Sequence, residues 1–201
     1  KTLGMAAAYQ GDFAQSADAD EDALRLYRQT GDLFYQGVVL GNLSEVYLAL
    51  GDTAKALEAV RGALTAAQAS NDAVGVVYSR KGIAAVQLAR GELAAALATY
   101  RQALSDLQKT PLPQIEGETW NDLGQLYHRM ADDAASERAY ARAQAVWTKI
   151  KHTFGTVDTT LNEGEALLDR ADRVGATAKF QSALALAERD GLKSPQVRAL
   201  R

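Results

Sequence analysis

Hydrophobic residues recur along the chain at the three- and four-residue spacing of helices, and short polar corners interrupt them at regular intervals. At steps of 40 residues, a corner places Gly or Ala before an acidic residue. Gly suits the position that follows a helix C-terminus, and Asp is a good N-cap for the next helix. The corners are Gly11-Asp12, Gly51-Asp52, Gly91-Glu92, Ala131-Asp132 and Ala171-Asp172. The pattern predicts pairs of helices joined by these corners, and therefore an all-α chain.

Small residues repeat in register with the corners. When repeats begin at Gly37, Val77, Gly117 and Val157, three repeat positions hold only Gly, Ala or Ser. Position 8 holds Gly4, Ser44, Ala84, Gly124 and Gly164; position 20 holds Ser16, Ala56, Ala96, Ser136 and Ala176; position 27 holds Ala23, Ala63, Ala103, Ala143 and Ala183. Two helices approach closely only where side chains are small, so these positions mark helix contacts within and between hairpins. A single hairpin cannot bury both of its faces, and stability must come from stacking.

The repeats divide the chain into a partial repeat at 1–36, repeats at 37–76, 77–116, 117–156 and 157–196, and the start of a further helix at 197–201. Turn residues mark the joins between repeats, at Gly31-Asp32, Ser70-Asn71-Asp72, Pro111-Leu112-Pro113 and Lys193-Ser194-Pro195. We expect a single solenoid. Because the chain begins and ends inside the pattern, we also expect it to be a segment of a longer protein.

The repeat 117–156 shows the pattern most fully, as a large residue, Leu-Gly, Tyr, and then small, aromatic and Ala positions. These are Trp120, Leu123, Gly124, Tyr127, Ser136, Tyr140 and Ala143. The order resembles the tetratricopeptide repeat, and the 40-residue period resembles its long-repeat subgroup, found in kinesin light chain and bacterial peptide-sensing regulators. The resemblance covers essentially the whole chain and implies a right-handed superhelical solenoid of antiparallel helix hairpins. Asp20, Gln87 and Glu163 depart from it, at two aromatic positions and a Leu position.

Composition agrees with this class of protein. The chain has 201 residues, a net charge of -3 and 47% hydrophobic residues, without a transmembrane run. The mild acidity argues against a nucleic-acid partner, which normally requires a basic face. The absence of cysteine excludes disulfides and thiolate metal sites, and it agrees with a reducing compartment. We expect a cytoplasmic protein that binds neither nucleic acid nor membrane.

Groups for catalysis are scarce. The two histidines, His128 and His152, lie 24 residues apart, and no Gly-rich phosphate loop, nucleophile elbow or metal-ligand spacing is present. The sequence therefore predicts no enzymatic activity, no cofactor and no metal site. An acidic run at Asp18, Asp20, Glu21 and Asp22 is interpreted as a solvated helix face, with attraction of a basic partner as the alternative.

Stacked hairpins create an extended concave surface, and the resemblance implies that the first helix of each repeat lines it. The candidate partner-binding residues at the positions that project into this surface are Asn42, Glu45, Tyr78, Lys81, Asn121, Asp122, Gln125, His128, Arg129, Asp158, Asn162, Glu165 and Asp169. Asn42, Asn121 and Asn162 resemble the peptide-gripping Asn of the long-repeat subgroup. A carboxamide both donates and accepts, so it can pair with the main chain of an extended peptide. The alternative is that these are tolerated polar residues on a wet helix face.

The charges of this surface are unevenly placed. Lys81 and Arg129 are its clear cations, and Asp158, Glu165 and Asp169 make its far end acidic. The Lys/Asn pattern that chaperone-binding tetratricopeptide proteins use to hold a C-terminal carboxylate is not reproduced.

The function predicted from shape and resemblance is a non-catalytic scaffold that binds a protein or extended peptide segment in its concave groove. One alternative is a sensory or regulatory segment of a larger signalling or transcription-regulating protein, in which a ligand changes the curvature of the solenoid. The other is a self-association module that forms a homo-oligomer through the open ends of the solenoid.

Overall fold

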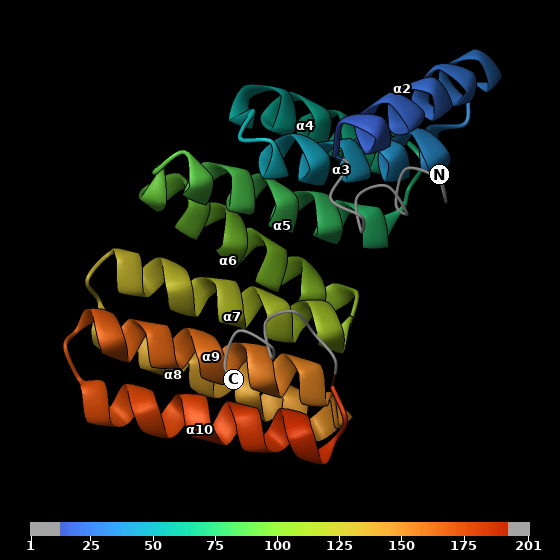
Figure 1. The fold of residues 1–201 in the computed structure, drawn as a ribbon. Helices are drawn as coiled ribbons and strands as arrows, with labels where there is room; N and C mark the ends of the chain where they lie inside the picture. Colours follow the sequence, from blue (N-terminus) through green and yellow to red (C-terminus); the bar gives the residue numbers. More distant parts are fainter. Residues whose placement is uncertain (1–12, 193–201) are drawn as a thin grey trace. The chain divides into compact units, whose positions relative to one another are not determined.

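The structure is a computed structural model that describes residues 13–192. Within these residues the chain forms nine α-helices and no strand (Figure 1). The helices are α2 (Phe13–Thr30), α3 (Leu33–Ala49), α4 (Thr53–Ala69), α5 (Ala73–Ala89), α6 (Leu93–Lys109), α7 (Pro113–Arg129), α8 (Asp133–Ile150), α9 (Thr153–Asp169) and α10 (Arg173–Arg189). The predicted all-α class is confirmed.

The chain divides into two compact units, Lys1–Thr110 and Pro111–Arg201. In unit 1, α3 pairs with α4 and α5 with α6, while α2 packs on α3 and α4 on α5. In unit 2, α7 pairs with α8 and α9 with α10, and α8 packs on α9. The first helices of successive hairpins also meet, α3 with α5 and α7 with α9. This stacking of hairpins is the helical-repeat solenoid fold that the sequence predicts.

Left-handed backbone at the first residue confirms the predicted corners inside the described range. The φ angle is 80° at Gly51, 76° at Gly91, 57° at Ala131 and 62° at Ala171. The next residue caps the following helix: Oδ1 of Asp52 accepts from the Lys55 N–H at 3.0 Å, and Asp132 and Asp172 make the same bond in their helices. Glu92 precedes α6 without such a bond. The corner Gly11-Asp12 lies outside the described residues.

The joins between hairpins use the same geometry, except the predicted join at Pro111-Leu112-Pro113, which has no left-handed residue and where Pro113 begins α7. Gly31 and Asn71 have φ angles of 71° and 54°, as the turn residues predicted. Lys151, with φ 55°, was not predicted, and Nδ1 of His152 accepts from the Gly155 N–H there at 2.9 Å. The left-handed residue after α10 is Gly191, with φ 65°, so the last join begins before the predicted Lys193. Residues 193–201, including the helix expected at 197–201, lie outside the described residues.

The columns of small residues lie at the closest helix contacts. Within residues 13–192, every residue at positions 20 and 27 is at most 3% exposed, except Ala23, which is half-buried. At position 8, a Cβ on Gly124 would lie 2.3 Å from the Tyr140 ring, and one on Gly164 would lie 2.5 Å from Phe180. Burial in this contact raises the pKa of the Tyr140 phenol. In the repeats at 117–156 and 157–196, position 8 is therefore where an aromatic ring of the second helix packs against the first helix.

The departures from the repeat pattern have local partners. Oε1 of Gln87 accepts from the Thr99 hydroxyl at 2.8 Å, and Glu163 forms an ion pair with Lys179. The interpretation of the acidic run as a solvated face is wrong for Asp20, which is 1% exposed. Asp20 occupies the repeat position of Tyr140, which faces the hairpin interior, whereas Glu21 and Asp22 are exposed.

The column at position 8 yields a stability prediction with a matched control. Gly124→Ala should lower the free energy of unfolding by about 1–3 kcal/mol, because the buried Tyr140 ring has to move. Gly41→Ala, in the interior of α3, adds a Cβ that meets nothing within 4 Å and should raise the free energy of unfolding by about 0.4–1 kcal/mol. Urea unfolding of both variants tests this. A Gly124→Ala variant as stable as the parent would show that the assigned contact is wrong.

Candidate partner-binding face

All of the predicted binding residues that project from the repeats lie on first helices. Asn42 and Glu45 belong to α3, and Tyr78 and Lys81 to α5, in unit 1. In unit 2, α7 carries Asn121, Asp122, Gln125, His128 and Arg129, and α9 carries Asp158, Asn162, Glu165 and Asp169. The residues therefore form two groups, one in each compact unit.

In unit 1, a groove runs between α3 and α5 above α4, with a volume of about 560 Å³. We call it the α3–α5 groove. Its rim carries Phe34, Val74 and Tyr78, which are 47%, 40% and 53% exposed. Its floor includes Ala63 and Ala67. The volume falls in the range of about 300–1,000 Å³ that is usual for ligand sites, and the surroundings are mostly apolar.

Three predicted residues, Asn42, Glu45 and Tyr78, line this groove, and Lys81 is not among the lining residues. The Nδ2 atom of Asn42 is buried and has no hydrogen-bond partner among the described residues. Such a buried donor costs about 1–3 kcal/mol until an acceptor reaches it. A residue that lines the groove thus carries an amide donor without a partner among the described residues.

Phe34 and Val74 were missed at the sequence level. Both stand in the first turn of a first helix, 40 residues apart, at the repeat position that Phe154 also holds. The recurrence of large apolar residues at an exposed helix start was the signal that could have found them. Phe154 is 44% exposed, so the same feature returns in unit 2.

In unit 2, the predicted carboxamides bind one another. Nδ2 of Asn162 donates to Oδ1 of Asn121 at 3.1 Å, and Nδ2 of Asn121 donates to Oδ2 of Asp158 at 3.1 Å. Asn121 is 6% exposed. The three side chains therefore connect α7 to α9, and their use in partner binding stays a prediction.

A buried indole lies against the same two first helices, α7 and α9. Trp147 of α8 is 2% exposed, and its Nε1 donates to the Thr159 hydroxyl at 2.9 Å. A Cβ added to Gly117 or to Gly155 would come within 2.6 Å of the ring. The ring thus lies directly against the backbone of both first helices.

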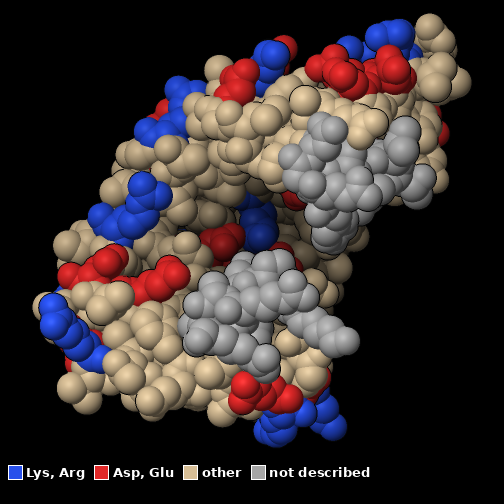
Figure 2. Space-filling view, viewed as in Figure 1, with Lys and Arg blue, Asp and Glu red and all other residues tan. Residues whose placement is uncertain are grey.

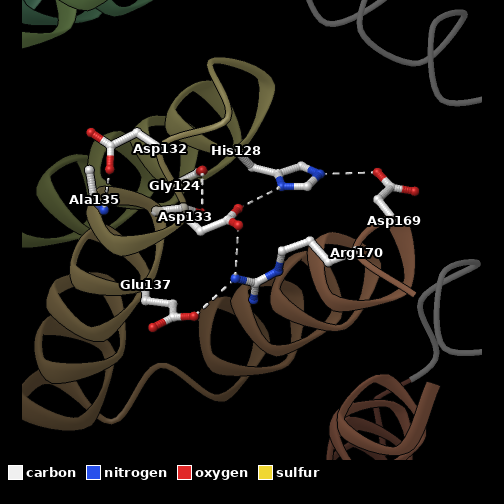
Figure 3. Close-up of polar contacts among 9 residues, drawn as sticks. Gly124, His128, Asp132, Asp133, Ala135, Glu137, Asp169 and Arg170 are labelled. Carbon is white, nitrogen blue, oxygen red and sulfur yellow. Dashed lines mark hydrogen bonds and ion pairs between the residues drawn. The ribbon is translucent and has the colours of Figure 1, made fainter. Parts of the chain in front are cut away.

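His128 belongs to a charged cluster where α7 ends, α8 begins and α9 ends (Figure 3). Its Nε2 lies 3.1 Å from Oδ2 of Asp169, and its Nδ1 lies 3.8 Å from Oδ1 of Asp133. Arg170 contacts Asp133 at 3.4 Å and Glu137 at 3.1 Å, and the hydrogen bond to Glu137 raises the pKa of the guanidinium. The predicted acidic end of the face is therefore partly paired within unit 2.

The remaining predicted residues lie on the same first helices. Lys81, Asp122 and Gln125 are half-buried, and Arg129 and Glu165 are exposed. On the face drawn in Figure 2, acidic and basic side chains occur near one another in small groups, and neutral surface lies between the groups.

Residues 13–192 contain neither a candidate metal site nor a candidate membrane-spanning helix. No group of three or more His, Asp or Glu side chains there is arranged to hold a metal ion. None of the helices in this range has the length and apolar composition needed to cross a membrane.

Comparison with known proteins gives a family match. Residues 1–69 and 35–109 match the family model of the tetratricopeptide repeat. No curated protein sequence matches the chain.

Solved structures share the fold at low sequence identity. A signal-transduction ATPase with a tetratricopeptide repeat sensor from Pyrococcus horikoshii aligns with a TM-score of 0.76 and 14% identity, covering 99% of this chain and 31% of its own. A Rap protein complexed with competence and sporulation factor aligns at 0.81 and 16%, covering 92% and 52%. BtubC from P. vanneervenii aligns at 0.72 and 20%, covering 93% and 76%. The chain thus spans about a third of the ATPase and half of the Rap protein.

The hydrogen bonds of the face predict different roles for two asparagines. Asn121→Ala should lower the free energy of unfolding by about 1–3 kcal/mol, because Asn162 and Asp158 lose their partner. Asn42→Ala should lower the free energy of unfolding by no more than about 0.5 kcal/mol. The reason is that Nδ2 of Asn42 forms no hydrogen bond with the described residues, so the substitution breaks none there. Urea unfolding compares the two, and equal losses would contradict the assigned bonding.

Proposed function

The chain belongs to the tetratricopeptide repeat family, and on this premise we propose that it is a non-catalytic scaffold that binds a segment of a partner protein along its first helices. The fold is generally that of a protein-interaction scaffold. The part of the proposal that concerns this chain is the place of binding, the α3–α5 groove in unit 1.

The observation that carries this proposal is the buried Nδ2 of Asn42 in a groove with an apolar rim. An extended segment brings both groups that the groove lacks. Its main-chain carbonyl accepts from Nδ2 of Asn42, and its side chains cover Phe34 and Tyr78. Removing exposed apolar surface from water contributes about 25 cal/mol per Å², so the rim favours binding beyond the single hydrogen bond.

A second candidate function is sensing within a larger signalling protein. Two neighbours of the fold favour it: the ATPase is described with a tetratricopeptide repeat sensor, and the Rap protein is complexed with competence and sporulation factor. The same groove would then hold the signal molecule, and binding would change the affinity of another part of the parent protein.

Affinity capture followed by titration of one captured partner tests the groove. The double variant Asn42→Ala/Tyr78→Ala should weaken binding by roughly ten- to a hundredfold, because it removes one hydrogen bond and one aromatic contact. The control is Leu26→Ala/Val174→Ala, which truncates side chains that are 62% and 84% exposed on second helices.

Circular dichroism melting first confirms that both variants fold. If the groove variant then binds the partner normally while the control loses it, the partner lies on the second helices and the proposal is wrong.

A further inference from the structure

Each residue of unit 1 can be compared with the residue 80 positions later, which holds the same repeat position in unit 2. This comparison relates the α3–α5 groove of unit 1 to the space between α7 and α9 in unit 2. In unit 2, the indole of Trp147 lies against Gly117 and Gly155 and donates to the hydroxyl of Thr159. These three residues form a cradle for a tryptophan side chain: two glycines that leave room for a flat ring, and one hydroxyl that accepts from its N–H.

The same cradle stands in unit 1 without its indole. Gly37, Gly75 and Ser79 occupy the places of Gly117, Gly155 and Thr159, and all three line the α3–α5 groove. The tryptophan position, however, holds Ala67. The glycines show the difference directly, because Gly117 and Gly155 are buried whereas Gly37 and Gly75 are half-buried.

The polar closure of unit 2 is also missing in unit 1. Asn121 and Asn162 join α7 to α9 by a hydrogen bond, and Gly41 and Gly82 stand in their places. Both glycines line the α3–α5 groove, and a Cβ on Gly41 would meet nothing within 4 Å. Ala67 of the second helix is too small to fill the groove as Trp147 does in unit 2. Gly41 and Gly82 have no side chains, so they cannot form the hydrogen bond that joins the first helices of unit 2.

We propose that the α3–α5 groove binds a tryptophan side chain of a partner segment, held in unit 1 as the chain's own Trp147 is held in unit 2. The proposal rests on the proposed function and names the side chain that the groove selects. The indole lies against Gly37 and Gly75 above Ala67, and its N–H donates to the hydroxyl of Ser79. Nδ2 of Asn42 donates to a main-chain carbonyl of the same segment.

The charges of the groove select the residues that flank this tryptophan. Glu45 and Asp72 are among the lining residues, which include no lysine or arginine. A segment with Lys or Arg beside its tryptophan therefore complements the groove, and an acidic segment is repelled. Such flanking charges also make the affinity fall as the salt concentration rises.

Calorimetric titration with short synthetic peptides tests the side chain. The probe is acetyl-Lys-Ala-Trp-Ala-Lys-amide, compared with the same peptide carrying Leu in place of Trp and with free N-acetyltryptophanamide. We expect the tryptophan peptide to bind at least about tenfold more tightly than the other two, because only it combines an indole N–H with main-chain and charged contacts.

Two variants of the full chain test the place. Ala67→Trp puts an indole on the second helix, where Trp147 stands in unit 2, and should abolish peptide binding. Gly41→Asn builds half of the bridge that Asn121 makes and should weaken binding at least about tenfold even if Ala67→Trp does not fold. Val174→Trp on α10, at a position that is 84% exposed, is the matched control and should bind as the parent does.

The outcomes separate the two proposals. If Ala67→Trp blocks a captured partner but the Leu peptide binds as well as the Trp peptide, the groove is used and the tryptophan is wrong. If Ala67→Trp and Gly41→Asn both bind that partner normally, the groove itself is wrong. Equal affinity for N-acetyltryptophanamide and for the peptide would identify a small aromatic ligand instead. Self-association that Ala67→Trp abolishes would identify a second copy of the chain. Either result overturns the inference.

Discussion

The close approach of helices at small side chains is the constraint on which the rest of this structure depends. At positions 20 and 27 of the repeat, buried Ala and Ser let each second helix lie close to its neighbours. At position 8, Gly124 and Gly164 receive the rings of Tyr140 and Phe180. Because interiors are packed as densely as organic crystals, helix spacing set in this way leaves little freedom elsewhere. What remains open between the first helices is then decided by very few side chains.

The two compact units show both outcomes of that decision. In unit 2, Trp147 fills the space between α7 and α9, and Asn121 and Asn162 bridge it. In unit 1, Ala67 and two glycines leave a groove of about 560 Å³. The space between the first helices is therefore filled in one unit and open in the other, and the side chains at the equivalent positions differ in volume.

The sequence predicts features that depend on residues close together in the chain better than contacts between distant residues. The corner Gly51-Asp52 was predictable from local chemistry, because Gly readily adopts the left-handed conformation and Asp is a good N-cap. Ala131-Asp132 was predictable because it recurs in register with that corner. The small-residue columns were predictable from their recurrence. Lys151 was not, because lysine has no preference for the left-handed conformation that it adopts there. The placement of the candidate binding residues on first helices followed from the repeat register.

The contacts between repeats could not be predicted in the same way. The sequence predicts that Asn121 and Asn162 each face either a partner or solvent, yet they bind each other across 41 residues of sequence. That bond depends on how α7 meets α9. The open groove was also invisible at a period of 40 residues, because Gly37 and Gly75 have their counterparts at a step of 80.

The central claim, that one side chain of a second helix decides whether the space between first helices is filled or open, has a direct measurement. Indole is titrated by calorimetry into the parent chain and into Trp147→Ala, with folding of the variant confirmed by circular dichroism. We predict one indole site in the parent, in the α3–α5 groove, and two in Trp147→Ala, since the emptied cradle of Gly117, Gly155 and Thr159 becomes a second site. A folded Trp147→Ala that binds no more indole than the parent would contradict the claim.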